Sequence, residues 1–299
     1  MRPALFTNGI RASRDLLTEL ADAGLVDVAF HVDLTQRRRG YNTEGELNAL
    51  RHRYIERARG LPLSVFFNTT VFDGNFAQIP DIVSFFVRHC DVVRLASFQP
   101  QADIGRGLFG QRAPGIDTAA VIRQIEQGAR ATLSFDTAHI GHERCNRYAM
   151  AFVANGHVYD VLDNKELYRG VLERTACLQF DRQYPRRAVG TMLRALVRNP
   201  DLVIKGLPWA ASKLWRMKPD LIAARGRVHK LSFFIHNLMD ACDLDKERVD
   251  ACVFMAATGD GAVSMCVHNA ERERYLPKPV AIALPPRLGR RESAHRNVR

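Results

Sequence analysis

Short β-branched and aromatic runs recur through the first hundred residues, and each is followed by a stretch with helical periodicity. The runs are Ala4–Thr7, Val26–Val32, Leu63–Val71 and Val92–Ser97. Strands buried on both faces read as nearly continuous apolar runs, so this alternation predicts parallel strands in an α/β fold. Ligands of such sheets and barrels bind where the strands end at their carboxyl side. Here those ends read TNG, HVD, NTT and SFQP, which suits a small polar ligand.

The stretches between these runs carry ordinary helix signals. We expect helices over residues 11–23, 46–59, 78–90 and 117–128. Thr43 and Glu46 have the spacing of a capping box, Pro80 lies in a first turn, and Asp117 suits an N-cap. The glycine-rich residues 101–116 predict a mobile loop.

From Thr137 onward the pattern changes. Asn155-Gly156 between two apolar runs predicts a hairpin, and Gly259-Asp260-Gly261 predicts a second one within residues 252–266. Basic amphipathic helices are expected over 186–230, a short strand over 231–235 and a helix over 236–251. We therefore divide the chain into an α/β part (1–136), an α+β part with a cysteine-bearing hairpin (137–284) and a disordered basic tail (285–299).

Composition indicates an ordinary globular protein. Of the 299 residues, 46% are apolar and 25% are charged. No run approaches the roughly 20 apolar residues that span a bilayer, and the start, MRPALFTNGI, lacks the apolar length of a signal peptide. With six cysteines and no such signal, we expect a cytoplasmic protein in a reducing compartment.

The net charge of +11 is concentrated in two segments. Residues 186–230 hold eleven Lys and Arg against two Asp, and residues 287–299 hold five Arg against one Glu. Such segments favour an anionic partner. Trp209, Trp215 and several leucines among these cations suit the surface of an anionic membrane, to which the protein would be peripheral. A solvated basic face is an open alternative. Nucleic acid is less favoured, because no helix-turn-helix, zinc-finger or RNA-recognition signature is present.

An ordered set of motifs points to a known family. TNG, HVDLT, NTTVFDGN and SFQP are followed by IGHERCN and finally by HNLMDACDLDKERVDACVF and DGAVSMCVHN. With this set, over about residues 4–280, the chain resembles the radical S-adenosylmethionine (SAM) enzymes, closest to the branch of tetraether lipid synthase and the related pterin methyltransferase. The resemblance implies an incomplete parallel (β/α) partial barrel whose strand ends bind SAM. It also implies a four-iron four-sulfur cluster that cleaves SAM to a 5′-deoxyadenosyl radical. The matching SAM positions are Thr7, Asn8, Asp33, Asn68, Thr69 and Gln99.

The chain departs from this family at one essential place. It has no CxxxCxxC loop for the catalytic cluster and no glycine-glycine-glutamate strand for the amino group of SAM. In the family's order Ala4–Thr7 would be the third strand, so we expect an N-terminally truncated chain. A gene-model error, a first half encoded as a separate chain and a degenerate remnant all fit. A parallel strand at residue 4 would also be a bare sheet edge, which missing sequence or a partner should cover.

Four cysteines are candidate metal ligands. Cys252 and Cys266 flank the second predicted hairpin, which brings them close together. Thiolates bind iron–sulfur clusters and structural zinc, and the family carries auxiliary metal centres in this half. The proposed set is Cys145, Cys242, Cys252 and Cys266, with His236, His142 or His268 as substitutes. Alternatively these are small buried thiols, as we expect for Cys90 and Cys177.

Other polar residues also admit two interpretations. Asp33 and Asn68 could bind a ligand or cap the loops that follow their strands. His31, within a strand, is expected to be a core histidine. Asp240, Asp243 and Asp245 could form a metal or acid–base set, but a solvated helix face is the simpler interpretation.

Three functions follow from these patterns. The first is the C-terminal portion of a radical SAM enzyme that acts at unactivated carbon of an apolar, lipid-like substrate and is inactive alone. The second is a non-catalytic peripheral membrane or partner-binding protein with a remnant barrel. The third is a zinc-stabilised binding module. No residue is assigned a catalytic role from the sequence.

Overall fold

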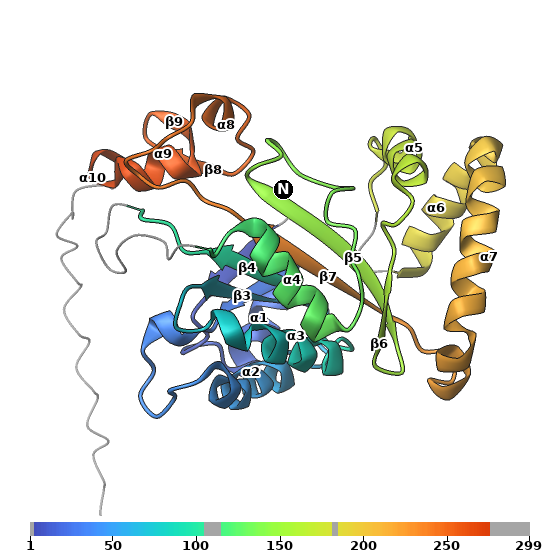
Figure 1. The fold of residues 1–299 in the computed structure, drawn as a ribbon, viewed down its shortest axis with the longest axis horizontal. Coiled ribbons are helices and arrows are strands. Elements are labelled where there is room, and N and C mark those ends of the chain that lie inside the picture. Colours follow the sequence, from blue (N-terminus) through green and yellow to red (C-terminus); the bar gives the residue numbers. More distant parts are fainter. Residues whose placement is uncertain (1–2, 105–114, 181–184, 276–299) are drawn as a thin grey trace, which may run out of the picture.

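A computed structural model describes residues 3–104, 115–180 and 185–275. Its main element is a seven-stranded sheet of order β1-β2-β3-β4-β7-β5-β6 (Figure 1). The first five strands in this order are parallel, and β5 and β6 are antiparallel to their neighbours. The expected α/β fold with a mostly parallel sheet is confirmed. The sheet is open, and the described residues form no closed barrel.

The strands lie close to their expected positions. The structure extends the fourth expected strand to Pro100 and the 231–235 strand to His229–His236. Asn155 and Gly156 both have positive φ and join the first hairpin, as a two-residue type I′ turn requires. The strands are β1 (Ala4–Thr7), β2 (Asp27–His31), β3 (Ser64–Val71), β4 (Val93–Pro100), β5 (Asn146–Ala154), β6 (His157–Asp160) and β7 (His229–His236).

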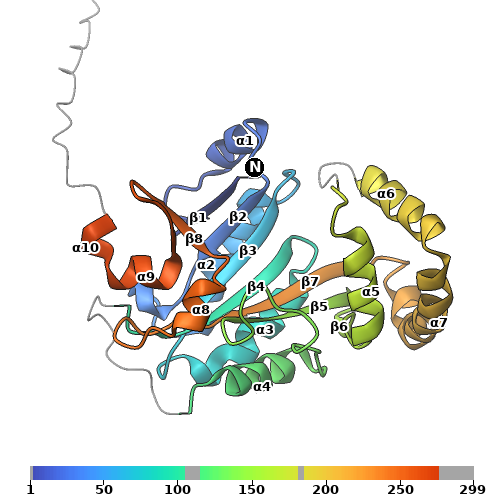
Figure 2. The same cartoon turned by 90° about the horizontal axis from the view of Figure 1, so that it is seen from above.

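Four helices cover one face of this sheet, as Figures 1 and 2 show. They are α1 (Arg14–Asp22), α2 (Glu44–Ala58), α3 (Ile79–Arg88) and α4 (Thr118–Ala129). The capping box of Thr43 and Glu46 is present, and the side chain of Asp117 accepts a hydrogen bond from the Ala120 amide at 2.7 Å. Both predicted caps are therefore confirmed, and α2 begins two residues before its expected start.

The hydrophobic core lies between the sheet and these helices. Phe30 and Phe67 on neighbouring strands stack with Tyr54 of α2 and Phe86 of α3, with ring centroids 4.9 and 5.2 Å apart. All four rings are buried. Val28 and Phe30 of β2, with Val65 and Phe67 of β3, face this core and anchor the sheet to the helices.

The C-terminal half of the chain completes the same sheet. β7 pairs in parallel with β4, and β5 pairs antiparallel with β7. The boundary expected at residues 136 and 137 therefore does not divide the sheet. The expected tail (285–299) and most of the expected mobile loop (101–116) lie outside the described residues.

A helical group lies beyond the β6 side of the sheet (Figures 1 and 2). It consists of α5 (Lys165–Thr175), α6 (Pro185–Arg198) and α7 (Pro200–Ala223). The basic helices expected over 186–230 are confirmed as α6 and α7. No described helix combines the length and apolar character that crossing a bilayer demands.

A small C-terminal segment follows β7. It contains α8 (Lys246–Asp250), β8 (Met255–Thr258), β9 (Gly261–Ser264), α9 (Met265–Ala270) and α10 (Arg272–Tyr275). The expected hairpin about Gly259 is confirmed as β8–β9. The helix expected over 236–251 is wrong, because β7 continues through His236 and only Lys246–Asp250 is helical. The carboxylate of Asp240 instead accepts the Asp103 amide at 2.6 Å, and Asp245 caps the short helix.

Candidate functional site on the open face of the sheet

The face of the sheet opposite α1–α4, here called the open face, carries every second residue of each strand. In β3, Val65, Phe67, Thr69 and Val71 are buried on the helix side. Phe66, Asn68 and Thr70 alternate with them and are only half-buried. Register partners in neighbouring strands share a face, so the pairing of the strands assigns the other side chains.

This assignment produces rows across the open face that change from apolar to polar. One row is almost wholly apolar and consists of Phe6, Ala29, Phe66, Leu95, Ser232 and Met150. Two residues closer to the carboxyl ends of the parallel strands, the next row consists of His31, Asn68, Ser97, Phe234 and Tyr148. Beyond it, Thr70 and Gln99 lie side by side, and the polar residues of these last two rows are together called the polar row. The polar end of the face is the end where ligands of parallel sheets bind.

Three polar side chains of these rows have no partner within the described part of the chain. Asn68, Ser97 and Gln99 are half-buried, and their side chains form no hydrogen bond with a described residue. The hydroxyls of Tyr148 and Ser232, by contrast, pair with each other at 2.8 Å. Polar groups held on rigid strands without a protein partner can hydrogen-bond a ligand.

His31 in the polar row is oriented by a buried carboxylate. Its Nε2 lies 2.7 Å from Oδ2 of Asp33 and 3.3 Å from the hydroxyl of Thr70. Asp33 is fully buried, and its carboxylate also accepts hydrogen bonds from the amides of Thr35 and Thr70. The side chain of His31 is 41% exposed, and its Nδ1 has no hydrogen-bond partner among the described residues.

The pair stabilises two charges against the effect of burial. Burial alone would raise the pKa of Asp33, but the hydrogen bond and charge of His31, with the bonds from Thr35 and Thr70, lower it overall. Burial likewise opposes the charged imidazole, but the hydrogen bond and charge of Asp33 outweigh it and raise the pKa of His31. The carboxylate is therefore ionised at neutral pH and accepts the proton of Nε2, which leaves Nδ1 for a ligand.

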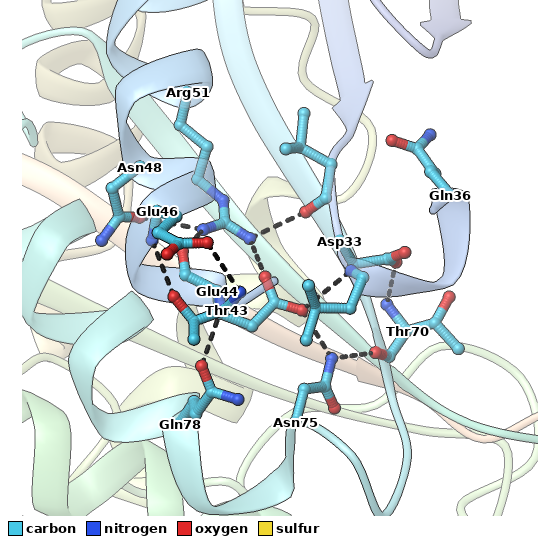
Figure 3. Close-up of polar contacts among 12 residues, drawn as sticks. Asp33, Gln36, Thr43, Glu44, Glu46, Asn48, Arg51, Thr70, Asn75 and Gln78 are labelled. Carbon is cyan, nitrogen blue, oxygen red and sulfur yellow. Dashed lines mark hydrogen bonds and ion pairs between the residues drawn. The ribbon is translucent and has the colours of Figure 1, made fainter. Parts of the chain in front are cut away.

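A second buried network fixes the loops after β2 and β3 (Figure 3). Glu44 and Arg51 of α2 form an ion pair that is completely buried. Arg51 also donates to the carbonyl of Val32 at 2.8 Å, and Glu44 accepts from the side chain of Asn75 at 2.7 Å. The same Asn75 amide reaches the carbonyl of Thr70 at 2.8 Å. The ends of β2 and β3 are thus tied together beneath the polar row.

Electrostatics makes this network costly to break. Burial lowers the pKa of Arg51, and the charge of Glu44 acts in the opposite direction. A buried charge that loses its partner is strongly destabilising, so the pair is expected to be kept whole. Nothing in the sequence spacing of Glu44, Arg51 and Asn75 marked them as partners.

The six predicted SAM positions fall into two groups. Asn68 and Gln99 lie on the open face. Asp33 and Thr69 are fully buried, and Asp33 N-caps the short 3-10 helix Leu34–Gln36, as the capping interpretation expected. The side chains of Thr7 and Asn8 accept hydrogen bonds from the amides of Gly9 and Ile10 within the turn after β1. The side chains of Asp33, Thr7 and Asn8 thus accept hydrogen bonds from nearby backbone amides, whereas the buried hydroxyl of Thr69 has no hydrogen-bond partner among the described residues.

Sequence reasoning missed several residues of the open face. His31 was expected in the core, which is wrong, since its side chain lies partly exposed beside Asn68. Ser97 and Thr70 were not singled out. A signal for them was present in the sequence. Ser97 is two residues from Gln99, and Thr70 is two residues from Asn68, so each pair lies on the same face of its strand.

The C-terminal segment packs against one end of the open face. The ring of Phe254 lies 4.5 Å from that of His236 and 6.2 Å from that of Phe234. Burial, with a contribution from the charge of Arg248, lowers the pKa of His236 to about 4. His236 is therefore neutral at physiological pH and contributes no charge to the site.

Arg248 interacts with two of the four predicted metal ligands, Cys145 and Cys266. The guanidinium of Arg248 donates to Sγ of Cys145 at 3.4 Å. Burial raises the pKa of Cys266, and the nearby thiols of Cys252 and Cys145 contribute to the rise. Cys242 is exposed. Within the described ranges, no three His, Cys, Asp or Glu side chains are arranged to hold a metal ion, so the metal centre stays a prediction.

Asp240, Asp243 and Asp245 do not converge either. Asp240 accepts from the Asp103 amide, whereas Asp245 caps α8 and pairs with Arg144. The carboxylates of Asp240 and Asp245 are directed at separate structural partners, so the described chain does not assemble the proposed acid–base set.

Comparison with known proteins places the chain in no family. No model of a known protein family matches it. A search of curated proteins finds no match either. The function must therefore be inferred from the residues of the site themselves.

Proposed function

We propose that the open face binds SAM and that the sheet is the arc of an incomplete barrel from a radical SAM enzyme. The observation that carries the proposal is the polar row at the carboxyl ends of consecutive parallel strands. Asn68, Ser97 and Gln99 lie there with no described hydrogen-bond partner, directly beyond an apolar row. Two of these three residues, Asn68 and Gln99, are also positions at which the sequence resembles the SAM-binding strands of that family.

The chemistry of SAM fits these residues. A side-chain amide both donates and accepts hydrogen bonds, as the edge of adenine does, so Gln99 would contact the base. Asn68 and Ser97 would bind the ribose hydroxyls. Phe66 and Leu95 in the adjoining row would contact the apolar face of the nucleoside. When bound, SAM would supply the carbon–sulfur bond that reductive cleavage breaks.

The iron–sulfur cluster does not fit the described residues in the same way. The sequence has no CxxxCxxC motif, and the described side chains gather no set of three ligands. We therefore derive no radical step from this chain. In this proposal a partner chain would carry the cysteine ligands of the cluster. Among the described strands β1 pairs only with β2, and Phe6 on it is 76% exposed, so this is the edge at which such a partner would add strands.

Calorimetric titration with SAM and with S-adenosylhomocysteine tests the proposal on the purified chain. We expect saturable binding that Asn68→Ala and Gln99→Ala each weaken by about tenfold, the effect of losing one or two hydrogen bonds. Gln127→Ala is the matched control, because Gln127 is exposed on α4 at the opposite face. Adenosine and methionine, titrated separately, show which part of SAM each residue contacts.

Two outcomes would reject this function. One is the absence of SAM binding by a chain whose circular dichroism shows that it is folded. The other is equal affinity in the wild type, Asn68→Ala and Gln99→Ala. A folded wild-type chain that binds lipid vesicles but not SAM would instead favour the non-catalytic membrane-binding alternative.

A further inference from the structure

Helix α6 exposes a narrow apolar stripe. Val189, Leu193 and Val197 are each four residues apart, so they lie on one side of the helix. All three are exposed, and Val197 reaches 81%. Ala195, on another side of the helix, is buried against the protein. The stripe is therefore presented to solvent while a separate face packs inward.

Helix α7 repeats this arrangement over a greater length. Leu202, Lys213 and Met217 are its buried residues. Its outward side carries exposed apolar side chains at spacings, mainly of three and seven residues, that keep them on one side of the helix. These are Ile204, Leu207, Leu214, Trp215 and Ile222. Trp215 is the most exposed of them at 76%. Burial of a tryptophan side chain would remove a large apolar area from water, so this exposure leaves a large apolar surface without a partner.

Cations accompany both stripes, and the nearby acidic groups are already occupied. Asp201 pairs with Arg174, and Asp220 accepts from Asn155, His157 and Tyr159. Lys205, Arg216 and Arg225, in contrast, are exposed and form no ion pair with a described residue. The positive charge of this surface is therefore left for an external partner.

A depression of about 500 Å³ lies between the start of α5 and the side of α7. Its lining includes Lys165, Lys205, Lys213 and Arg216, against Asp163 and Glu166. Asp163 pairs with Lys213 and accepts from Nε1 of Trp209 at 2.7 Å, which fixes both side chains in the wall. The remaining cations give the depression a positive surplus.

We propose that α6 and α7 bind the surface of a membrane rich in anionic phospholipids. Their apolar stripes enter the boundary between headgroups and acyl chains, and the depression beside α7 takes a phosphate headgroup. Exposed apolar stripes flanked by unpaired cations are the arrangement of helices that lie in this interface. The helices lie on the bilayer, since no described helix can cross it. This proposal uses other residues than the SAM site and is independent of it.

The two tryptophans make the proposal directly measurable. The chain has only Trp209 and Trp215, and both lie on α7. Trp209→Phe leaves Trp215 as the sole reporter in the stripe. We expect its emission to shift to shorter wavelength with phosphatidylglycerol-containing vesicles and not with pure phosphatidylcholine. Higher ionic strength should weaken binding, because exposed charges are screened.

Three sets of variants separate the contributions. Leu214→Ser with Trp215→Ser should abolish flotation with the vesicles. Lys205→Gln with Arg216→Gln should weaken vesicle binding by about tenfold or more. Arg53→Gln with Arg88→Gln removes the same charge from exposed positions on α2 and α3 and should leave binding unchanged. Thermal unfolding monitored by circular dichroism confirms that each variant is folded.

Several results would overturn the proposal. One is the absence of binding to phosphatidylglycerol vesicles. Another is an equal loss of vesicle binding in the α7 double variant and in the Arg53→Gln, Arg88→Gln control, because this would show that binding depends only on the net charge of the protein. Self-association through Trp215, detected by sedimentation without vesicles, would assign the stripe to a second copy. Binding of duplex oligonucleotides that needs Lys205 and Arg216, without vesicle binding, would assign it to nucleic acid.

Discussion

Asp33 is completely buried, yet its carboxylate has a hydrogen-bond partner at each oxygen. It caps the loop after β2, accepts the amide of Thr70 across to β3, and orients His31 on the open face. One residue therefore connects the stability of the loops to the chemistry of the site. His31 is the only group of the polar row whose charge changes near neutral pH, because Asn68, Ser97 and Gln99 do not titrate there.

This pairing predicts a pH dependence of stability. The raised pKa of His31 means that its stabilising charge is fully present below the unfolded value of about 6.5 and is lost as pH rises through the folded value. The free energy of unfolding should therefore fall by about 1 kcal/mol over this range, a modest figure because the imidazole is partly exposed. Asp33→Asn should lower the pKa of His31, measured by NMR titration of the imidazole, and flatten this slope. His139→Gln, which changes an exposed histidine, should keep the wild-type slope, and an unchanged slope in Asp33→Asn would contradict the assignment.

Among the secondary-structure elements, α3 and α4 show how local signals and packing combine. Asp117 and the apolar spacing predict where α4 begins, but they do not show how closely it approaches α3. Gly128 permits that approach, since a Cβ at this position would lie 2.7 Å from both Cα of Pro80 and Cβ of Val83. The hydroxyl of Ser84 donates to the carbonyl of Gly128 at 2.9 Å, so the two helices also share a hydrogen bond.

Substitutions of two helical glycines should therefore have opposite effects. Gly128→Ala should lower the free energy of unfolding by about 1–3 kcal/mol, because the added methyl group forces α3 and α4 apart. Gly190→Ala in α6 meets no atom within 4 Å and should raise it by roughly 0.5–1 kcal/mol through helix propensity. Equilibrium urea denaturation of both variants measures the difference. A neutral Gly128→Ala would show that the helices are less tightly packed than this structure indicates.

In the whole molecule, the two edges of the sheet, formed by β6 and β1, differ from each other. At one end β6 is followed by α5–α7, whose inward face packs on the protein. At the other, β1 pairs only with β2 among the described strands. Phe6 and Ile10 are exposed beside this edge. Unpaired strand edges with apolar side chains promote association with another strand.

We expect the chain to associate through β1 as its concentration rises. Phe6→Lys should reduce this association, because a charge on an edge strand opposes strand pairing. Sedimentation velocity over a concentration series measures the effect. Val253→Lys, at an exposed apolar residue of the C-terminal segment, is the control and should behave as the wild type. Equal association of Phe6→Lys and wild type would show that β1 is not the contact.

Local physical chemistry is what the sequence by itself determined. The apolar runs, the capping box of Thr43, the cap at Asp117 and the Asn155-Gly156 turn depend on neighbours within a few residues, and the structure contains all of them. The basic amphipathic helices could be predicted equally well, because the periodicity of their apolar residues and their charge are local features of the sequence. The helix expected over 236–251 failed where long-range partners intervened, since Asp240 caps the backbone at Asp103.

The tertiary structure alone decided which side chains share the site. The spacing of two groups Asn68 with Thr70, but the run Asn68-Thr69-Thr70 has no hydrophobic alternation that would show which of its two faces is buried. Only the placement of α1–α4 on one face distinguishes them. The insertion of β7 between β4 and β5, which brings Ser97 beside Phe234, joins residues far apart in the chain. Such pairing depends on burial of the whole sheet, and no local pattern encodes it.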